Sequence, residues 1–346
     1  MTITVVGAGA IGGVLGAHLI KAGENVIFCD RAADHVDTMN KKGLTIESEH
    51  ETFTVPCVAY TPAQLVERQE PLDKVFLCVK AQHTTDALSP LVPLLNDNAY
   101  VVSFQNGLCE REIASLVGRE RTVGCFVNFS ADYLGPGHIL YGGVASLHLG
   151  ELDGTISTRL LDLQETLKAW GPAQVTDNVW GFLWGKLSYA ALLFGTALVD
   201  ETMATVVRAM DYRPTLMELC SEILEVAEHE RITPLGFDDW TPELVYPRET
   251  RNNEILDPQL EKLAARMAAN KKTKSGIWRD LVIRKRKTEV SHQLEPIIDI
   301  GEKYGLKLPL TRQVVTQIHE LEEGKRLLNW GNLEELKAKF EIGRNT

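Results

Sequence analysis

A lone lysine precedes a long apolar stretch in the second half of the chain. Lys186 stands in "WGKLSYAALLFGTALVD", and residues 189–199 after it carry no charged side chain. Burying an ammonium group without a partner is costly, and such a lysine loses its proton more readily than an exposed one. One interpretation is therefore that Lys186 is buried for a purpose. The alternative is a structural lysine at the end of a buried helix, with its ammonium group reaching water.

A glycine-rich segment near the N-terminus has the pattern of a dinucleotide site. In "VVGAGAIGG", Gly7, Gly9 and Gly12 follow an apolar β-branched run and open a helical pattern. In this context the first glycine allows a tight turn and the second lets the backbone approach a pyrophosphate. The third lets the helix pack closely on the strand. Residues 7–12, which include Ala10 and Ile11, are therefore predicted to bind the cofactor, with its phosphates at the helix N-terminus.

A carboxylate follows the next predicted strand. Asp30 lies 18 residues after Gly12. An acidic side chain at this place binds the hydroxyls of the adenine ribose, and its charge repels a 2′-phosphate. Asp30 therefore favours NAD. Arg31 is able to face a 2′-phosphate instead, so NADP is the alternative.

The elements that must hold these residues follow two patterns. The first half alternates helical patterns with strands that are apolar throughout, as in a parallel sheet covered by helices on both faces. The expected strands are residues 2–8, 25–30, 74–80, 99–105, 122–133 and 138–151, with a helix over 11–22. From Trp180 onward helical patterns predominate. The expected helices are residues 180–199, 202–230, 257–270, 277–304 and 310–328, with an irregular connection over 232–256.

These patterns predict an α/β fold in two domains. Residues 1–172 form an N-terminal Rossmann-type doubly wound sheet that binds the dinucleotide. Residues 173–346 form an all-helical C-terminal domain.

The composition limits the kinds of partner. The 346 residues carry a formal net charge of −11, which argues against general binding to nucleic acid or anionic membranes. The six cysteines include no CxxC pair and no zinc-like spacing, so no metal is expected. The N-terminus has no secretory pattern, and the apolar run 189–199 is too short to cross a bilayer. The sequence thus predicts a cytoplasmic protein that acts on a small molecule.

Five short segments occur in one order along nearly the whole chain. They are "GAGAIG" at 7–12, "VKAQ" at 79–82, "QNG" at 105–107, "WGKL" at 184–187 and "SGIWRDLVIRKRKTE" at 275–289. In this order and spacing the chain resembles the ketopantoate reductase (2-dehydropantoate 2-reductase) family. The last segment looks like the family's Ser…Asp…Thr-Glu helix, here slightly longer between Ser275 and Glu289.

The resemblance implies a role for each matched position. Lys186 matches the general acid that protonates the ketone oxygen as hydride reaches the carbon. Lys80 is implied near the cofactor, and Asn106 along the nicotinamide and substrate cleft; a strand-end lysine and an Asn-Gly turn are the plain alternatives. Ser275 matches a substrate-binding hydroxyl, and Glu289 a carboxylate that binds a substrate hydroxyl. The additional residues between them leave open whether either position has that role.

The chain departs from the family's pattern on the predicted helix that carries Lys186. The family has two asparagines, one and two turns after the lysine and on the same face. Here these positions are Ala190 and Phe194. The loss of both amides removes hydrogen-bond partners for a hydroxylated substrate, which makes ketopantoate doubtful. The orientation of Lys186 must then come from elsewhere, such as the Asn106 region, Ser188 or the substrate.

These observations leave three functions to compare. The first is a nicotinamide-dependent oxidoreductase that interconverts a small 2-oxo acid, or a related ketone, and its 2-hydroxy product. The second is an NAD(P)-binding sensor with a decayed catalytic site, which the missing asparagines favour and the retained Lys186 and Glu289 oppose. The third is a hydroxy-acid or polyol dehydrogenase that works mainly in the oxidative direction. The resemblance also suggests that residues 173–346 bind the substrate and form the interface of a homodimer.

Overall fold

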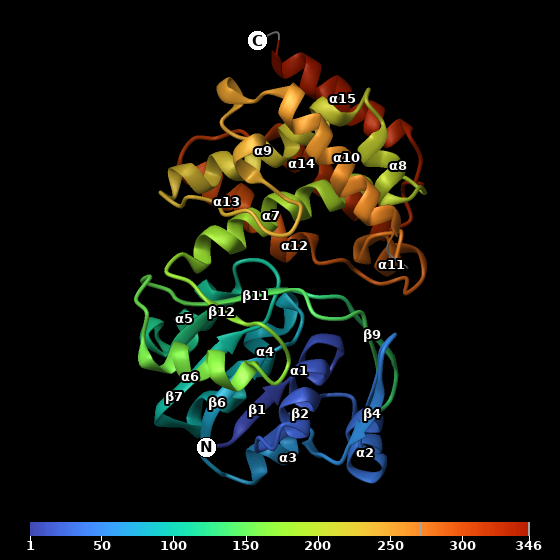
Figure 1. The fold of residues 1–346 in the computed structure, drawn as a ribbon. Coiled ribbons are helices and arrows are strands. Elements are labelled where there is room, and N and C mark those ends of the chain that lie inside the picture. Colours follow the sequence, from blue (N-terminus) through green and yellow to red (C-terminus); the bar gives the residue numbers. More distant parts are fainter. Residues whose placement is uncertain (270–271, 345–346) are drawn as a thin grey trace. The chain divides into compact units, whose positions relative to one another are not determined.

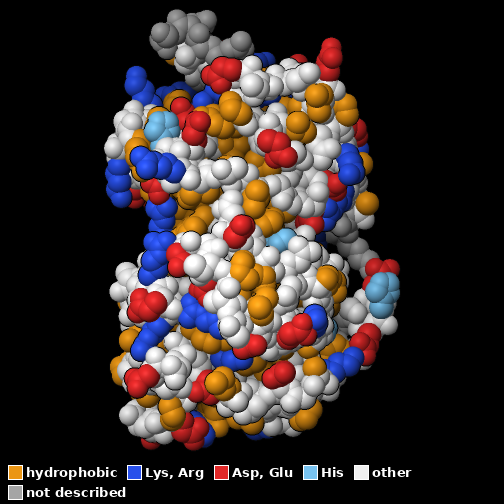
Figure 2. Space-filling model, turned by 60° about the vertical axis from the view of Figure 1, so that its left-hand side comes forward, with side chains coloured by type: hydrophobic (Ala, Val, Ile, Leu, Met, Phe, Trp, Pro, Cys, Tyr) orange, Lys and Arg blue, Asp and Glu red, His pale blue; other side chains and the backbone are white. Residues whose placement is uncertain are grey.

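The computed structural model describes residues 1–269 and 272–344 and divides the chain into two compact units. The units are Met1–Val179 and Trp180–Thr346. The predicted boundary was residue 172, but Gln174 and Val175 form strand β12 of the first sheet, so the division falls later. Within the described ranges, no helix is long and apolar enough to cross a membrane. On the face shown in Figure 2, acidic and basic side chains are interspersed.

The first unit is built on an eight-stranded, mostly parallel sheet (Figure 1). The doubly wound parallel sheet was predicted, but its strands β5 and β12 were not. Six of its strands follow the spatial order β5-β2-β1-β6-β7-β8, which is the doubly wound dinucleotide-binding arrangement. Beyond β8, strand β11 pairs antiparallel and carries β12. In spatial order the strands are β5 (Val58–Tyr60), β2 (Val26–Cys29), β1 (Ile3–Val6), β6 (Leu72–Leu77), β7 (Leu95–Ser103), β8 (Thr122–Asn128), β11 (Ser146–Glu151) and β12 (Gln174–Val175).

Helices cover both faces of this sheet because its strands are apolar on both sides. One buried cluster includes residues of helices α1 and α6, and a second cluster includes residues of α3, α4 and α5. The helices of the unit are α1 (Ala10–Lys21), α2 (Ala33–Lys42), α3 (Pro62–Glu67), α4 (Thr84–Leu88), α5 (Cys109–Val117) and α6 (Thr158–Leu167).

A second, four-stranded sheet was not predicted. Its order is β4-β3-β10-β9, from β4 (Thr52–Val55), β3 (Leu44–Glu47), β10 (His138–Tyr141) and β9 (Ala131–Gly135). The run 138–151, predicted as one strand, is divided at Gly142 and Gly143 between the two sheets. Helix α1 lies against both sheets. A Cβ added to Gly12 would press on Val5 of β1, whereas one added to Gly13 would overlap Ile139 of β10.

The second unit is helical (Figure 1). Its helices are α7 (Val179–Thr196), α8 (Met203–Arg208), α9 (Arg213–His229), α10 (Asn253–Ala269), α11 (Gly276–Val282), α12 (Val290–Gln293), α13 (Glu295–Lys303), α14 (Pro309–Glu322) and α15 (Gly331–Arg344). The predicted helix 202–230 is divided into α8 and α9, and Pro214 lies in the first turn of α9. Helix α10 begins earlier than predicted, and residue 270, its predicted end, lies outside the described residues.

Candidate active site

Three loops of the first unit meet at one edge of the parallel sheet. Gly7 follows β1, Lys80 follows β6 and Asn106 follows β7, and these three strands are parallel neighbours. The strand order reverses between β1 and β6, because the chain runs from β1 outward to β2 and later returns to β6. Ligands of doubly wound sheets bind at such a switch point, outside the carboxyl ends of the strands.

The three motif glycines have different reasons to be glycine. Gly7 has a φ of +93°, and a Cβ there would lie 2.8 Å from the Val79 nitrogen. A Cβ on Gly12 would lie 2.8 Å from Val5 Cγ1 and would overlap the Gly7 carbonyl oxygen. A Cβ on Gly9, in contrast, would meet nothing within 4 Å. The fold therefore requires Gly7 and Gly12, whereas at Gly9 it leaves open space of the kind that a bound pyrophosphate needs.

Gly9 also begins the helix that faces this space. It is the N-cap of α1 and provides no side-chain cap, and Gly13 N–H donates to its carbonyl oxygen at 2.8 Å. The first-turn N–H groups of a helix, here those of Ala10 and Ile11 among others, have no partner within the helix. This end of α1 thus fits the phosphates of a dinucleotide.

Asp30 is fixed at the end of β2 by the loops around it. One carboxylate oxygen accepts the Ala8 N–H at 2.8 Å, and the other accepts the Ala32 N–H at 2.9 Å. The side chain is half-buried, and Arg31 beside it is exposed. Asp30 therefore holds the glycine loop as well as placing negative charge at the predicted ribose position.

A glutamine that we did not predict joins the other two loops. Gln105 is 4% exposed, and its Nε2 donates to the Val79 carbonyl and to Thr84 Oγ1, both at 2.9 Å. It thereby ties the loop of Lys80 to the loop of Asn106. Lys80 is half-buried, and Asn106 is exposed before Gly107, whose φ is +93°. Gln105 belongs to the "QNG" segment, and that membership is the one sequence feature that could have marked it as part of the site.

In the second unit, Lys186 lies on helix α7 and is the only charged side chain of that helix. Most of α7 is buried, but residues three or four apart form one half-buried stripe. The stripe consists of Phe182, Lys186, Tyr189, Ala190 and Leu193. Burial raises the pKa of Tyr189 to about 12, so its phenol stays neutral at physiological pH. Lys186 is therefore the one ionic group on an otherwise uncharged surface of α7.

The surroundings of α7 correct two predictions. Phe194 is fully buried, so it is a core residue, and Leu193 is the residue that continues the lysine stripe two turns on. Ser188 donates to the Gly185 carbonyl at 2.7 Å and accepts from Trp240 Nε1 at 2.9 Å. These contacts hold the Ser188 hydroxyl within the helix packing, so it is not a candidate to orient Lys186.

The predicted helix 277–304 is divided into α11, α12 and α13, and Ser275 and Glu289 precede α11 and α12 respectively rather than lying on one helix. Ser275 is the N-cap of α11, is 4% exposed and accepts the Trp278 N–H at 3.1 Å. Helix α11 ends at Val282, and Asp280 accepts from Arg284 and Arg286, at 2.9 and 3.0 Å, in the segment that follows. Lys285 adopts a left-handed conformation, with φ of +47°.

Glu289 is half-buried and precedes α12. Its neighbour Thr288 donates through N–H and hydroxyl to one Glu322 oxygen, both at 2.7 Å. The other Glu322 oxygen lies 3.0 Å from His319 Nδ1, and His319 Nε2 lies 2.7 Å from Glu295. This network fixes the segment that carries Glu289.

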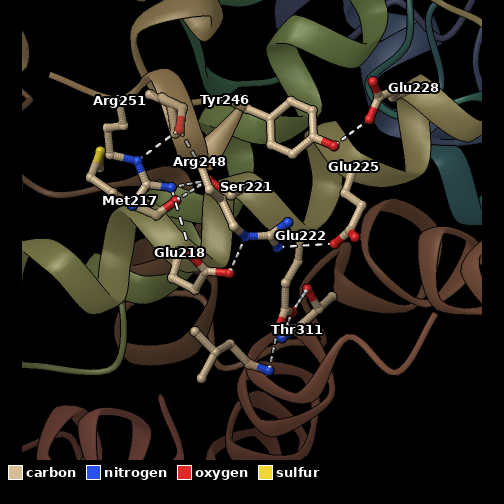
Figure 3. A network of polar contacts seen from close by, with 12 residues as sticks. Met217, Glu218, Ser221, Glu222, Glu225, Glu228, Tyr246, Arg248, Arg251 and Thr311 are labelled. Carbon is tan, nitrogen blue, oxygen red and sulfur yellow. Dashed lines mark hydrogen bonds and ion pairs between the residues drawn. The ribbon is translucent and has the colours of Figure 1, made fainter. Parts of the chain in front are cut away.

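A cavity of about 820 Å³ lies within the helical unit, but none of the predicted site residues lines it. Several of its polar side chains contact one another (Figure 3). Arg248 pairs with Glu218 at 2.6 Å and with Glu225 at 2.9 Å. Glu222 accepts the N–H groups of Leu310 and Thr311, at 2.9 and 2.7 Å, at the start of α14. These contacts hold α9 to α14 and to the 245–251 segment. We therefore interpret the network as one that stabilises the helical unit, not as a ligand site.

Comparison with known proteins agrees with both units. The model of the family "Ketopantoate reductase PanE/ApbA" matches residues 3–154, and the model of its C-terminal domain matches residues 178–322. A 2-dehydropantoate 2-reductase of Mesorhizobium japonicum is 29% identical over 265 residues, which cover 69% of this chain and 79% of the relative. One from Archaeoglobus fulgidus is 26% identical over 93% of this chain and 98% of its own.

Solved structures share the fold. A PanE/ApbA family ketopantoate reductase from Ralstonia eutropha superposes with a TM-score of 0.78 at 24% identity, covering 94% of this chain and 99% of that one. D-mandelate dehydrogenase in complex with NADH gives a TM-score of 0.77 at 20% identity, with the same coverage. The family models and the curated relatives identify the chain as a nicotinamide-dependent oxidoreductase of the dehydrogenase/reductase class. Within that class, the chain belongs to the ketopantoate reductase family.

Proposed function

We propose that the protein interconverts a small 2-oxo acid and its 2-hydroxy acid, with Lys186 as the general acid and base. The nicotinamide supplies or accepts the hydride. Reduction leaves negative charge on the ketone oxygen, and a donor within hydrogen-bond reach stabilises that charge and delivers the proton. The observation that carries this proposal is the position of Lys186 as the single charged side chain of α7, on its half-buried stripe.

Other residues take supporting roles in this proposal. The N–H groups at the start of α1 bind the pyrophosphate, while Lys80 and Asn106 contact the nicotinamide half or the substrate. Ser275 and Glu289 bind the substrate. For Ser275, the bond to Trp278 N–H uses an acceptor lone pair, so its O–H remains a donor for a ligand.

We further propose that the 2-oxo acid carries an apolar side chain. One and two turns after Lys186 on its stripe lie Ala190 and Leu193, neither of which hydrogen-bonds to a substrate hydroxyl. The other residue that follows on the stripe, Tyr189, packs its ring against Phe237 and Trp240. A site discriminates strongly for a hydroxyl only where it provides a partner for it. Ketopantoate, which carries a hydroxyl, is therefore a less suitable substrate. D-mandelate dehydrogenase, which shares the fold, has been solved with NADH and anilino(oxo)acetate, so aromatic 2-oxo acids belong in the test.

NAD is the proposed cofactor. The Asp30 carboxylate is held at the end of β2 by two backbone N–H groups and retains lone pairs for ribose hydroxyls. Its negative charge disfavours a 2′-phosphate at this place. Arg31 is exposed and is the residue that would favour NADP.

The test is a panel of 2-oxo acids and 2-hydroxy acids, assayed with NADH, NADPH and their oxidised forms by the absorbance of the reduced nicotinamide. The panel includes ketopantoate, branched aliphatic 2-oxo acids and phenyl-substituted 2-oxo acids. We expect turnover with NADH and a higher kcat/KM for apolar side chains than for ketopantoate. Cofactor binding without turnover on any member would instead favour a nucleotide-binding sensor.

A further inference from the structure

Ala8, in the glycine loop before helix α1, is held by hydrogen bonds to both its N–H and its carbonyl oxygen. The Ala8 N–H donates to Asp30 Oδ2 at 2.8 Å, and the Ala8 carbonyl oxygen lies 2.9 Å from Nε2 of His35. Ala8 itself is fully buried between Gly7 and Gly9. One side chain from the end of β2 and one from the first turn of α2 thus fix the middle of the glycine loop.

The geometry assigns the tautomer of His35. Its ring is 1% exposed, and its Nδ1 lies 2.9 Å from the N–H of Gly137. Because a backbone N–H only donates, Nδ1 must be the unprotonated acceptor. Nε2 then carries the hydrogen and donates it to the Ala8 carbonyl. The ring of Tyr133 packs edge-on against the imidazole at 5.1 Å.

Gly137 belongs to the second sheet, in the turn between β9 and β10. Its φ is +71°, and a Cβ there would lie 2.7 Å from Thr38 Cγ2 of α2. The turn therefore lies so close to α2 that only glycine fits at position 137. Through His35, this turn of the small sheet is connected to the glycine loop of the large sheet.

The bond from His35 orients the N–H of Gly9. In a trans peptide the C=O of one residue and the N–H of the next point in opposite directions. Fixing the Ala8 carbonyl toward His35 therefore directs the Gly9 N–H away from it, at the N-cap of α1. A Cβ on Gly9 would meet nothing within 4 Å, so this position borders open space. We propose that His35 is a positioning residue that orients the Gly9 N–H for the pyrophosphate of the nicotinamide cofactor.

Two substitutions separate this role from simple packing. In His35→Gln, the side-chain amide nitrogen reaches the position of Nε2 and keeps a donor for the Ala8 carbonyl, but the acceptor for Gly137 is lost. In His35→Asn, the side-chain oxygen reaches the position of Nδ1 and keeps the acceptor, but the donor to Ala8 is lost. Both variants lose one of the two bonds and part of the ring packing.

We expect His35→Asn to raise the Kd of NADH, measured by the fluorescence of the reduced nicotinamide, about tenfold, which is the effect of one hydrogen bond. The Kd of ADP-ribose should rise by the same factor, because it shares the pyrophosphate. His35→Gln should keep both Kd values close to those of the wild type. In steady state, His35→Asn should raise KM for the cofactor and leave kcat nearly unchanged.

Equal Kd changes in both variants, or a loss of thermal stability with unchanged Kd, would assign His35 to packing alone and overturn the proposal. Wild-type protein provides a test that does not depend on folding of a variant. Long-range ¹⁵N–¹H spectra of the histidine rings should show His35 with its hydrogen on Nε2, before and after NADH is added. A hydrogen on Nδ1 would contradict the donor role.

Discussion

Gln105 Nε2 donates to the Val79 carbonyl at 2.9 Å, and this bond joins two of the loops at the carboxyl edge of the first sheet. A second bond from the same nitrogen reaches Thr84 Oγ1, which itself donates to the Ala81 carbonyl at 2.8 Å. The segments "VKAQ" and "QNG" are far apart in the sequence, but Gln105 makes them one structural unit. Their joint occurrence in the chain therefore has a physical reason.

The two neighbouring motif glycines should respond differently to alanine. Gly9→Ala places a methyl group in open space, so we expect a loss of less than about 1 kcal/mol in the free energy of unfolding and a rise of at least about tenfold in the Kd of NADH. Gly12→Ala forces a Cβ onto the Gly7 carbonyl and Val5, and should cost about 1–3 kcal/mol. Calorimetry and urea unfolding measure the two effects. Unchanged NADH affinity in Gly9→Ala would argue against a pyrophosphate at this loop.

The charge of Asp30 should set the choice of cofactor. Asp30→Asn keeps an oxygen for one of the two backbone N–H groups but removes the charge that repels a 2′-phosphate. We expect the ratio of kcat/KM for NADPH to that for NADH to rise about tenfold. Arg31→Ala is the matched control and should lower that ratio. A wild-type enzyme that already prefers NADPH would contradict our choice of NAD.

The stripe of α7 should control the side chain that the substrate carries. An amide at position 190, in Ala190→Asn, lies one turn after Lys186 and should raise kcat/KM for ketopantoate about tenfold relative to an apolar 2-oxo acid. Leu193→Asn, two turns on, should add to this effect. Phe194→Asn instead introduces an amide into the core and should destabilise the protein by about 3–5 kcal/mol without any gain. If Phe194→Asn instead raised kcat/KM for ketopantoate, position 194, not Leu193, would lie at the substrate.

The network beside Glu289 should make stability depend on pH. Burial opposes the charged form of His319, but its hydrogen bonds to Glu295 and Glu322 outweigh burial and raise its pKa above the usual 6.5. A histidine with a raised folded-state pKa stabilises the protein below its unfolded pKa and loses that contribution as pH rises through the folded value. Wild type should therefore exceed His319→Gln in free energy of unfolding most clearly below pH 6.5, and less as pH rises.

Urea unfolding at a series of pH values measures this difference, and His50→Gln, at an exposed histidine, is the control. A difference that stays constant, or grows with pH, would show that His319 is not held as an imidazolium between the two carboxylates.

Much of the fold could be predicted because its local signals agree with its tertiary structure. The apolar strands and the "GAGAIG" turn predicted the parallel sheet and the start of α1. The second sheet was missed although Leu44 to Glu47 alternate buried and half-buried side chains, because the strand is only four residues long and pairs with the distant β10. The division of 138–151 between two sheets also depends on pairing far along the chain.

The sequence indicated candidate residues for the site, but not the contacts that surround them. Helical spacing placed position 194 near the face of Lys186, and only the packing of α7 shows that Leu193 lies on the half-buried stripe instead. The bonds of Gln105 and His35 likewise connect segments that are distant in sequence. Such contacts leave no periodic pattern from which they could be predicted.

The most direct test of the proposed function is the turnover of Lys186→Ala on the best substrate from the panel. General acid–base catalysis contributes about 10²–10⁴ in rate, so kcat should fall by that factor. The Kd of NADH should stay near the wild-type value, because the predicted cofactor residues all belong to the first unit. Lys303→Ala, at an exposed lysine of α13, is the control and should keep full activity. If Lys186→Ala retains near-wild-type kcat, Lys186 is not the general acid and serves only as the solvated cation of a buried helix.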